Sequence, residues 1–150
     1  MTQDEFLLNL QNGRQQWRKT WKGIDLFGTS RPRTPGDMSL RDILYHIYWY
    51  EHEVVEMIEQ RRFGGSPWWA LPADERNVHI KTEGEKCSLL QAWGLEQDTY
   101  AELVAKIQTL RDEELEEARF FQDMPSDLTP WEVIAGNTYE HYPDHLAGIF

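Results

Sequence analysis

The sequence contains one cysteine, Cys87, among its 150 residues. A single cysteine excludes both an intrachain disulfide and a cysteine-based zinc knuckle, and this usage indicates a reducing compartment. No apolar run approaches the roughly 20 residues that a membrane-spanning helix needs. The first residues also lack the basic start and the apolar stretch of a signal peptide. We therefore expect a cytoplasmic protein that does not bind membranes.

Basic residues are scarce as well. Fifteen lysines and arginines stand against 26 aspartates and glutamates, which gives a formal net charge of −11. A field of this sign repels phosphate backbones and anionic lipid. The basic residues between Arg14 and Lys22 surround two tryptophans, a pattern typical of the solvated face of a helix. The charge therefore argues against a nucleic-acid partner.

Aromatic residues, in contrast, are abundant at 13% and include seven tryptophans. Such rings must be buried in a core, a pocket or an interface. A chain of this length fits one domain over residues 1–150 and buries enough surface to fold without disulfides or structural metals. We expect a single domain with an aromatic-rich core.

Helix starts are marked by four capping-box patterns, in which a serine or threonine is followed three residues later by an acid or amide. Each precedes an apolar pattern of helical period. The four pairs are Thr2 and Glu5, Ser39 and Asp42, Ser88 and Gln91, and Thr129 and Glu132.

Further segments connect these four predicted helices. Turn residues predict loops at 31–37 and 64–72, a short helix follows over 73–82, and residues 111–118 are acidic and helix-favouring. The long link between the second and third helices suits a crossover connection. The sequence therefore predicts an all-α fold, an antiparallel four-helix bundle with a crossover connection and short helical insertions.

Three of the five histidines stand out by their placement. His141 and His145 are four residues apart on the fourth predicted helix, so both imidazoles lie on one face, one turn apart. His46 lies on the apolar side of the second predicted helix. Three imidazoles can bind one metal ion and leave open positions for water or substrate. The residues alone equally allow hydrogen-bonded core or boundary histidines.

The two histidine-bearing segments, residues 45–51 (YHIYWYE) and 134–145 (IAGNTYEHYPDH), resemble the DinB/YfiT-like superfamily. Proteins of that superfamily are four-helix bundles, often dimeric, that hold a divalent metal with one histidine from the second helix and two from the last. The resemblance implies His46, His141 and His145 as ligands. Three imidazoles suit several ions; we expect zinc or nickel first, and manganese or iron as further candidates.

Characterised relatives in the superfamily include transferases that use low-molecular-weight thiols, and some hydrolases. The resemblance therefore implies a metal-dependent enzyme of transferase or hydrolase type, a small-molecule substrate that includes such a thiol, and a homodimer. The alternative is a non-catalytic, stress-related bundle that binds or sequesters a small molecule.

Two residues near the histidines raise separate questions. Pro143 lies between His141 and His145 and removes the donor to the Tyr139 carbonyl, so the helix either bends and still presents both rings or turns His145 away. Glu53 follows His46 by seven residues on the same face. It is a candidate catalytic residue, as a general base or as a partner of a ligand. The alternative for Glu53 is an exposed acid or a partner of a nearby arginine.

The remaining candidates are weaker. His52 lies about 240° around its helix from His46, so we expect it to face solvent. His79 is placed to reach the mouth of a pocket, Asn137 can orient a ligand or bond along its own helix, and Trp68 and Trp69 are more typical of packing than of a substrate cage.

Overall fold

The computed structural model describes residues 1–24 and 38–147, and over these residues the fold is all-helical, with no β-strand. The predicted loop at 31–37 lies outside the described residues. The helices are α1 (Gln3–Lys22), α2 (Leu40–Gln60), α3 (Ala73–Gly84), α4 (Leu89–Ile107), α5 (Asp112–Glu116), α6 (Pro130–Gly136) and α7 (Tyr142–Leu146), with short 3₁₀ turns at Pro67–Ala70 and Ala118–Phe120.

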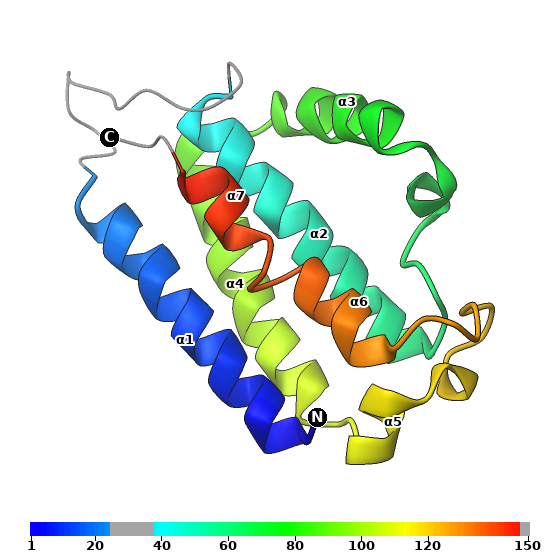
Figure 1. The fold of residues 1–150 in the computed structure, drawn as a ribbon. Helices are drawn as coiled ribbons and strands as arrows, with labels where there is room; N and C mark the ends of the chain where they lie inside the picture. Colours follow the sequence, from blue (N-terminus) through cyan, green and yellow to red (C-terminus); the bar gives the residue numbers. More distant parts are fainter. Residues whose placement is uncertain (25–37, 148–150) are drawn as a thin grey trace.

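The helices form a bundle in which α1 and the α6–α7 pair run in one direction and α2 and α4 run in the other (Figure 1). An ion pair between Lys106 and Glu59 joins the carboxyl ends of α4 and α2, which therefore lie parallel. Between them, α3 crosses the outside of α2 and returns the chain to its starting end (Figure 1). The predicted bundle and its crossover are confirmed, and the antiparallel relation holds between the two pairs of helices.

Local hydrogen bonds explain where three of the long helices begin. The capping boxes at Thr2, Ser39 and Ser88 all form, with reciprocal side-chain and backbone bonds. The box predicted at Thr129 does not form, because the backbone N–H of Glu132 bonds to the carbonyl of Thr129 at 3.0 Å instead of to its hydroxyl. Pro130 nevertheless occupies the first helical position, where its missing donor costs little.

The apolar core is divided into two main clusters along the bundle. One surrounds Phe6, Ile58 and Leu103, at the end of the bundle where α1 begins and α2 and α4 end. The other surrounds Trp17 and Trp21 and continues to Tyr142 of α7. The tryptophan-rich cluster therefore packs α7 against α1. None of the helices in the described part of the chain combines the length and apolar character that a bilayer crossing requires.

Candidate metal centre

The fourth predicted helix is divided in two where the histidines lie. Helix α6 ends at Gly136, residues 137–141 form turns, and α7 begins at Tyr142. Within the turns, the N–H of Glu140 bonds to the carbonyl of Ala135 at 3.0 Å. The single helix predicted over this region is therefore wrong.

Pro143 explains why a new helix starts at this point. A proline inside a helix lacks one backbone donor and crowds the preceding turn, whereas in a first turn that donor has no partner to lose. Pro143 falls in the first turn of α7, and the chain before it has left the α6 helix. The break does not turn His145 away: the new direction of α7 carries its ring toward His141 and His46.

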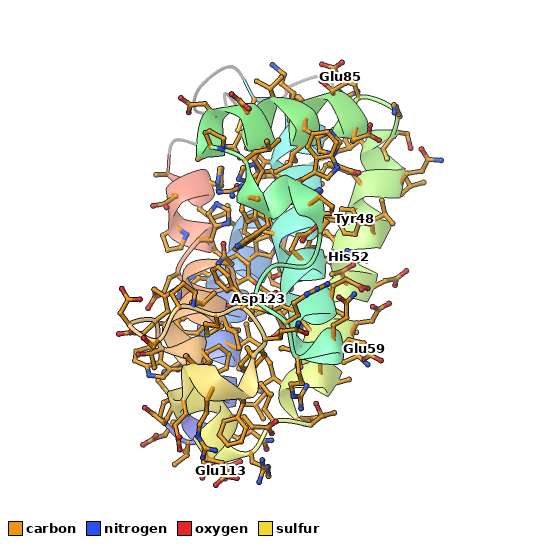
Figure 2. The ribbon with its side chains drawn as sticks, turned by 90° about the vertical axis from the view of Figure 1, so that its right-hand side faces the viewer. Tyr48, His52, Glu59, Glu85, Glu113 and Asp123 are labelled. Atoms are coloured by element: carbon orange, nitrogen blue, oxygen red, sulfur yellow. The ribbon has the colours of Figure 1, made fainter. Side chains whose placement is uncertain are left out.

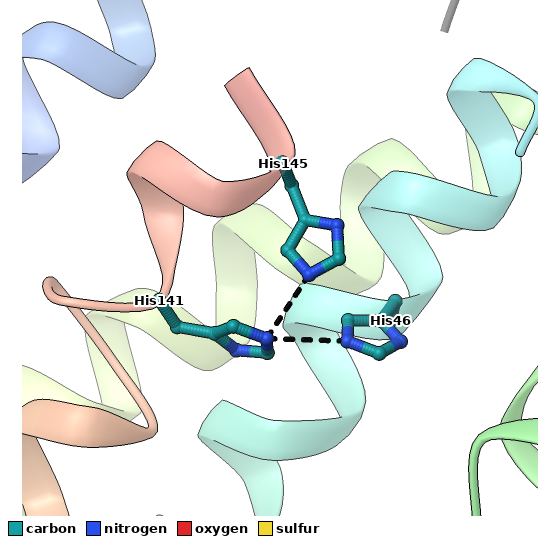
Figure 3. A group of neighbouring side chains, drawn as sticks. All are labelled: His46, His141 and His145. Atoms are coloured by element: carbon teal, nitrogen blue, oxygen red, sulfur yellow. Dashed lines mark hydrogen bonds between the residues drawn. The ribbon is translucent and has the colours of Figure 1, made fainter. Parts of the chain in front are cut away.

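The three ring nitrogens converge in the space between α2 and α7 (Figure 3). The Nε2 atom of His141 lies 3.2 Å from Nε2 of His46 and 3.0 Å from Nε2 of His145. One ligand atom from each histidine lies within 4.8 Å of the others. Two ligands at the usual ~2.0–2.1 Å from a metal lie roughly 2.9 Å apart at a right angle and roughly 3.4 Å apart at the tetrahedral angle. The two separations from Nε2 of His141, 3.0 and 3.2 Å, fall within that interval.

Burial keeps the three imidazoles neutral, which leaves lone pairs for a metal. Burial lowers the pKa of His46 to about 2 and the pKa of His141 to about 4, and the neighbouring histidines act in the same direction. Burial also lowers the pKa of His145. At neutral pH each ring therefore carries one N–H and one lone pair.

The histidines cannot satisfy one another by hydrogen bonding. A ring nitrogen offers either one proton or one lone pair, and Nε2 of His141 faces two other nitrogens. Only one of these two contacts can be a good hydrogen bond. A cation at the shared point would use all three lone pairs, so the donor set fits a divalent metal ion. The group His46, His141 and His145 can hold such an ion.

Tyr50 flanks this group and connects it to α3. Its ring centroid lies 4.9 Å from those of His46 and His141. Its hydroxyl donates to Oδ1 of Asn77 at 2.9 Å and accepts from Nε of Arg76 at 3.1 Å. None of these three residues was predicted from the sequence as part of the site. Tyr50 follows His46 by one helical turn, which was a usable signal, but the sequence carries no signal that brings Asn77 and Arg76 to this place.

A cavity of about 400 Å³ opens beside two of the histidines. This volume lies within the range of small-molecule sites. Three apolar and six polar or charged side chains form its wall. The wall consists of Met38, Asp42, His46, Asp74, Asn77, Val78, Ile80, Lys81 and His145.

Glu53, the predicted catalytic residue, lies elsewhere. It is buried against Gly65 and lines a separate, smaller pocket with Trp69 and Asn137. Seven residues of α-helix separate it from His46 by roughly 10 Å along the axis, although both share a face. Burial raises the pKa of Glu53, and the neighbouring Ser66 hydroxyl opposes that shift. Glu53 does not belong to the group of converging ligand atoms, and its catalytic role stays a prediction.

The alternative interpretation of Glu53 is wrong. Its side chain is not exposed, and the two nearby arginines have other partners: Arg61 pairs with Glu114, and Arg62 with Asp123.

The other candidate residues, His52, His79 and Asn137, lie outside the group of converging histidines. His52 is 43% exposed, as predicted, and lies with Tyr48 on the side of the molecule away from α7 (Figure 2). His79 stacks on Trp68 with ring centroids 3.5 Å apart and does not line the cavity. Asn137 donates to the carbonyl of Val133 at 2.7 Å, which is the bond along its own helix.

No protein-family model matches the sequence, and no curated protein matches it. The structure is similar to the crystal structure of an uncharacterised protein from Escherichia coli UTI89, with a TM-score of 0.76 and 18% sequence identity. The match covers 95% of this chain and 87% of the other. At this level of identity the similarity shows the fold alone.

Proposed function

We propose that this chain is a metal-dependent enzyme of the DinB/YfiT type, in which His46, His141 and His145 hold one divalent ion. The observation that carries the proposal is the convergence of three neutral Nε2 atoms, 3.0 and 3.2 Å apart, beside a cavity. Three protein ligands leave coordination positions for water or substrate, as catalytic rather than structural sites do.

Zinc or nickel is the expected ion, with manganese and iron as further candidates, because an all-imidazole set suits borderline transition metals better than hard cations. When bound, such an ion would supply Lewis-acid activation of a thiol, a water or a carbonyl. The reaction type is a thiol-dependent transfer or a hydrolysis. A low-molecular-weight thiol as co-substrate and a homodimeric assembly follow from the resemblance of residues 45–51 and 134–145 to that superfamily.

The chain's own residues would bind and orient the substrate. The apolar wall of Met38, Val78 and Ile80 would exclude water and take the apolar body of a small molecule. Asn77, held by the Tyr50 hydroxyl, and Lys81 offer polar contacts in the same cavity. These contacts favour a small substrate over a polymer.

A second candidate is a non-catalytic bundle that binds or sequesters a small molecule. One observation favours it: across residues 1–24 and 38–147, the converging ligand group contains three histidines and no carboxylate, so a general base would have to come from Asp42 or Asp74 of the cavity wall. In this case the metal binds and the cavity fills, but no reaction follows.

Metal content tests the site first. Protein prepared without a histidine tag should carry close to one equivalent of a divalent metal, and His141→Ala should lose it. His52→Ala is the matched control, because His52 is an exposed histidine that lies outside the group. Wild-type protein that contains no metal and takes up neither zinc nor nickel at micromolar concentration would sink the proposal.

Turnover then separates the two candidates. Metal-loaded wild-type protein should transfer a low-molecular-weight thiol to a small electrophile or hydrolyse a small ester, and His141→Ala should not. Metal binding without any turnover in either assay would favour the sequestering bundle.

A further inference from the structure

Glu51 is a fully buried carboxylic acid inside the bundle. Its side chain is 0% exposed, and Oε1 accepts a hydrogen bond from the hydroxyl of Tyr142. Tyr142 is also buried, and its ring packs on Trp17 with centroids 5.1 Å apart. The bond joins α2 to the first residue of α7.

Stability alone does not explain an acid at this position. Burial, together with the nearby Glu96, raises the pKa of Glu51 to about 8. Oε2 of Glu51 has no partner among the described residues. Buried polar pairs of this kind are often replaced by apolar residues without loss of stability, or with a gain. A residue that costs stability where a leucine would fit suggests a role in the site.

Within the described structure, the ring of His141 lacks the hydrogen bond that would normally fix its orientation. A metal-binding histidine usually donates its second ring nitrogen to a carboxylate or carbonyl, which fixes the ring. Nδ1 of His141 is buried and has no such partner in the described part of the chain. What fixes the chain at His141 is its own N–H bond to the Thr138 carbonyl at 3.0 Å and, one residue later, the bond from Tyr142 to Glu51.

The metal ligands come from the same two helices that this bond joins. His46 lies on α2 with Glu51, and His141 and His145 flank or lie in α7 with Tyr142. Helix α7 has only five residues and packs on α1. A direct link from α7 to α2 therefore controls how closely the two sets of ring nitrogens approach.

We propose that Glu51 and Tyr142 are positioning residues of the metal centre, which hold the α7 histidines against His46 at the separation that one ion requires. This inference rests on the proposed metal-binding function. The pair acts through the backbone and touches neither metal nor substrate. It takes the place of the hydrogen bond that the second nitrogen of His141 lacks.

The test uses the double variant Glu51→Leu with Tyr142→Phe, which removes both polar partners together and leaves neither unsatisfied. Without metal, its free energy of unfolding should equal or exceed that of the wild type. Its dissociation constant for zinc should rise about tenfold or more, the usual effect of losing a group that orients a ligand. A residue with a merely structural role would not move these two quantities in opposite directions.

Two single variants sharpen the result. Glu51→Gln keeps an oxygen that can accept from Tyr142, so zinc affinity should stay close to wild type. Tyr100→Phe is the control, since it removes a hydroxyl from another buried tyrosine, located on α4.

The outcomes separate the two proposals. Wild-type protein that does not bind zinc removes the proposed function, and this inference with it. A wild type that binds zinc, together with a double variant of unchanged affinity, overturns only the positioning role. A double variant that fails to fold would also overturn it, because the pair would then hold the fold and not the site.

Discussion

The histidine centre and the charge cluster formed by Arg14, Glu51, Glu96 and Tyr142 both place polar groups inside the bundle, and they do so in opposite ways. In the charge cluster the guanidinium of Arg14 meets both carboxylate oxygens of Glu96, and Tyr142 donates to Glu51. In the histidine centre the ring nitrogens of three neutral histidines meet at one place and cannot all be satisfied by hydrogen bonds to one another.

The two regions differ in what completes their polar groups. In the charge cluster, Arg14 supplies the counter-charge of Glu96, and both Glu51 and Glu96 are fully buried. The histidine centre lies beside a cavity, and its three ligand nitrogens offer lone pairs for a cation that the chain itself does not supply. The Arg14–Glu96 ion pair is complete within the chain and serves the fold, whereas the histidine group needs an added ion and serves binding. Variants of the Arg14–Glu96 pair should therefore act on stability, and variants of the histidines on metal affinity.

The largest expected effect comes from breaking the buried ion pair. Arg14→Leu leaves the buried carboxylate of Glu96 without its cation, so the free energy of unfolding should fall by about 3–5 kcal/mol. His46→Leu, which removes a neutral buried ring, should change the free energy of unfolding of the metal-free protein by less than about 1.5 kcal/mol. Urea denaturation of the metal-free proteins measures both.

Arg18→Leu is the control for the first of these variants, since Arg18 lies on the same helix and is exposed. It should stay within about 0.5 kcal/mol of wild type. If Arg14→Leu and His46→Leu lowered the free energy of unfolding equally, the proposed difference between the two regions would be wrong, because His46 would then contribute to the fold as much as the ion pair does.

The pH dependence of stability gives the next effect. The pKa of Glu51 is raised from 4.5 to about 8 by burial and by Glu96, so folding retains a proton that the unfolded chain releases. The contribution of that proton to stability is fully present below pH 4.5 and is lost as the pH rises through 8. Relative to Glu51→Gln, the wild type should lose up to about 1.4 kcal/mol per pH unit within that window.

Urea denaturation of wild type and Glu51→Gln at several pH values between 4 and 9 tests this effect. Two parallel profiles would show that Glu51 titrates like an exposed acid and that burial does not raise its pKa.

Local signals explain how much of the fold could be predicted. The starts of α1, α2 and α4 follow from capping boxes at Thr2, Ser39 and Ser88, because these bonds involve only neighbouring residues. The break before α7 could not be placed, although Pro143 signalled some disturbance. Its position depends on packing against α1, where Gly13 allows the turn at Tyr139 to approach.

The candidate site divides in the same way. Helical spacing and the family resemblance selected the three histidines that the structure brings together. Helical spacing also selected Glu53, because it shares a face of α2 with His46. Sharing a face was not enough, since seven residues of helix place Glu53 roughly 10 Å further along the axis. Glu51 occupies a core position one turn after Ile47, and an acid at such a position was the missed signal. Asn77 reaches Tyr50 only through the crossover, which no local pattern predicts.

The smallest expected effects come from two glycines, and they test whether the two regions share one support. The turn at Tyr139 leads into both His141 and Tyr142. A Cβ added at Gly13 would lie 2.7 Å from Cβ of Tyr139, whereas one added at Gly94 would meet nothing within 4 Å. Gly94→Ala should therefore raise the free energy of unfolding by about 0.5–1 kcal/mol, the usual helical gain.

Gly13→Ala should lose that gain to the clash and end about 1 kcal/mol less stable than wild type. Because the displaced turn leads into His141, the zinc affinity of Gly13→Ala should fall too, while the zinc affinity of Gly94→Ala should stay unchanged. Calorimetric zinc titration and urea denaturation of both variants measure the two quantities. A loss of stability in Gly13→Ala with wild-type zinc affinity would mean that the turn supports the charge cluster alone, and that the histidines are held by α2 and their own packing.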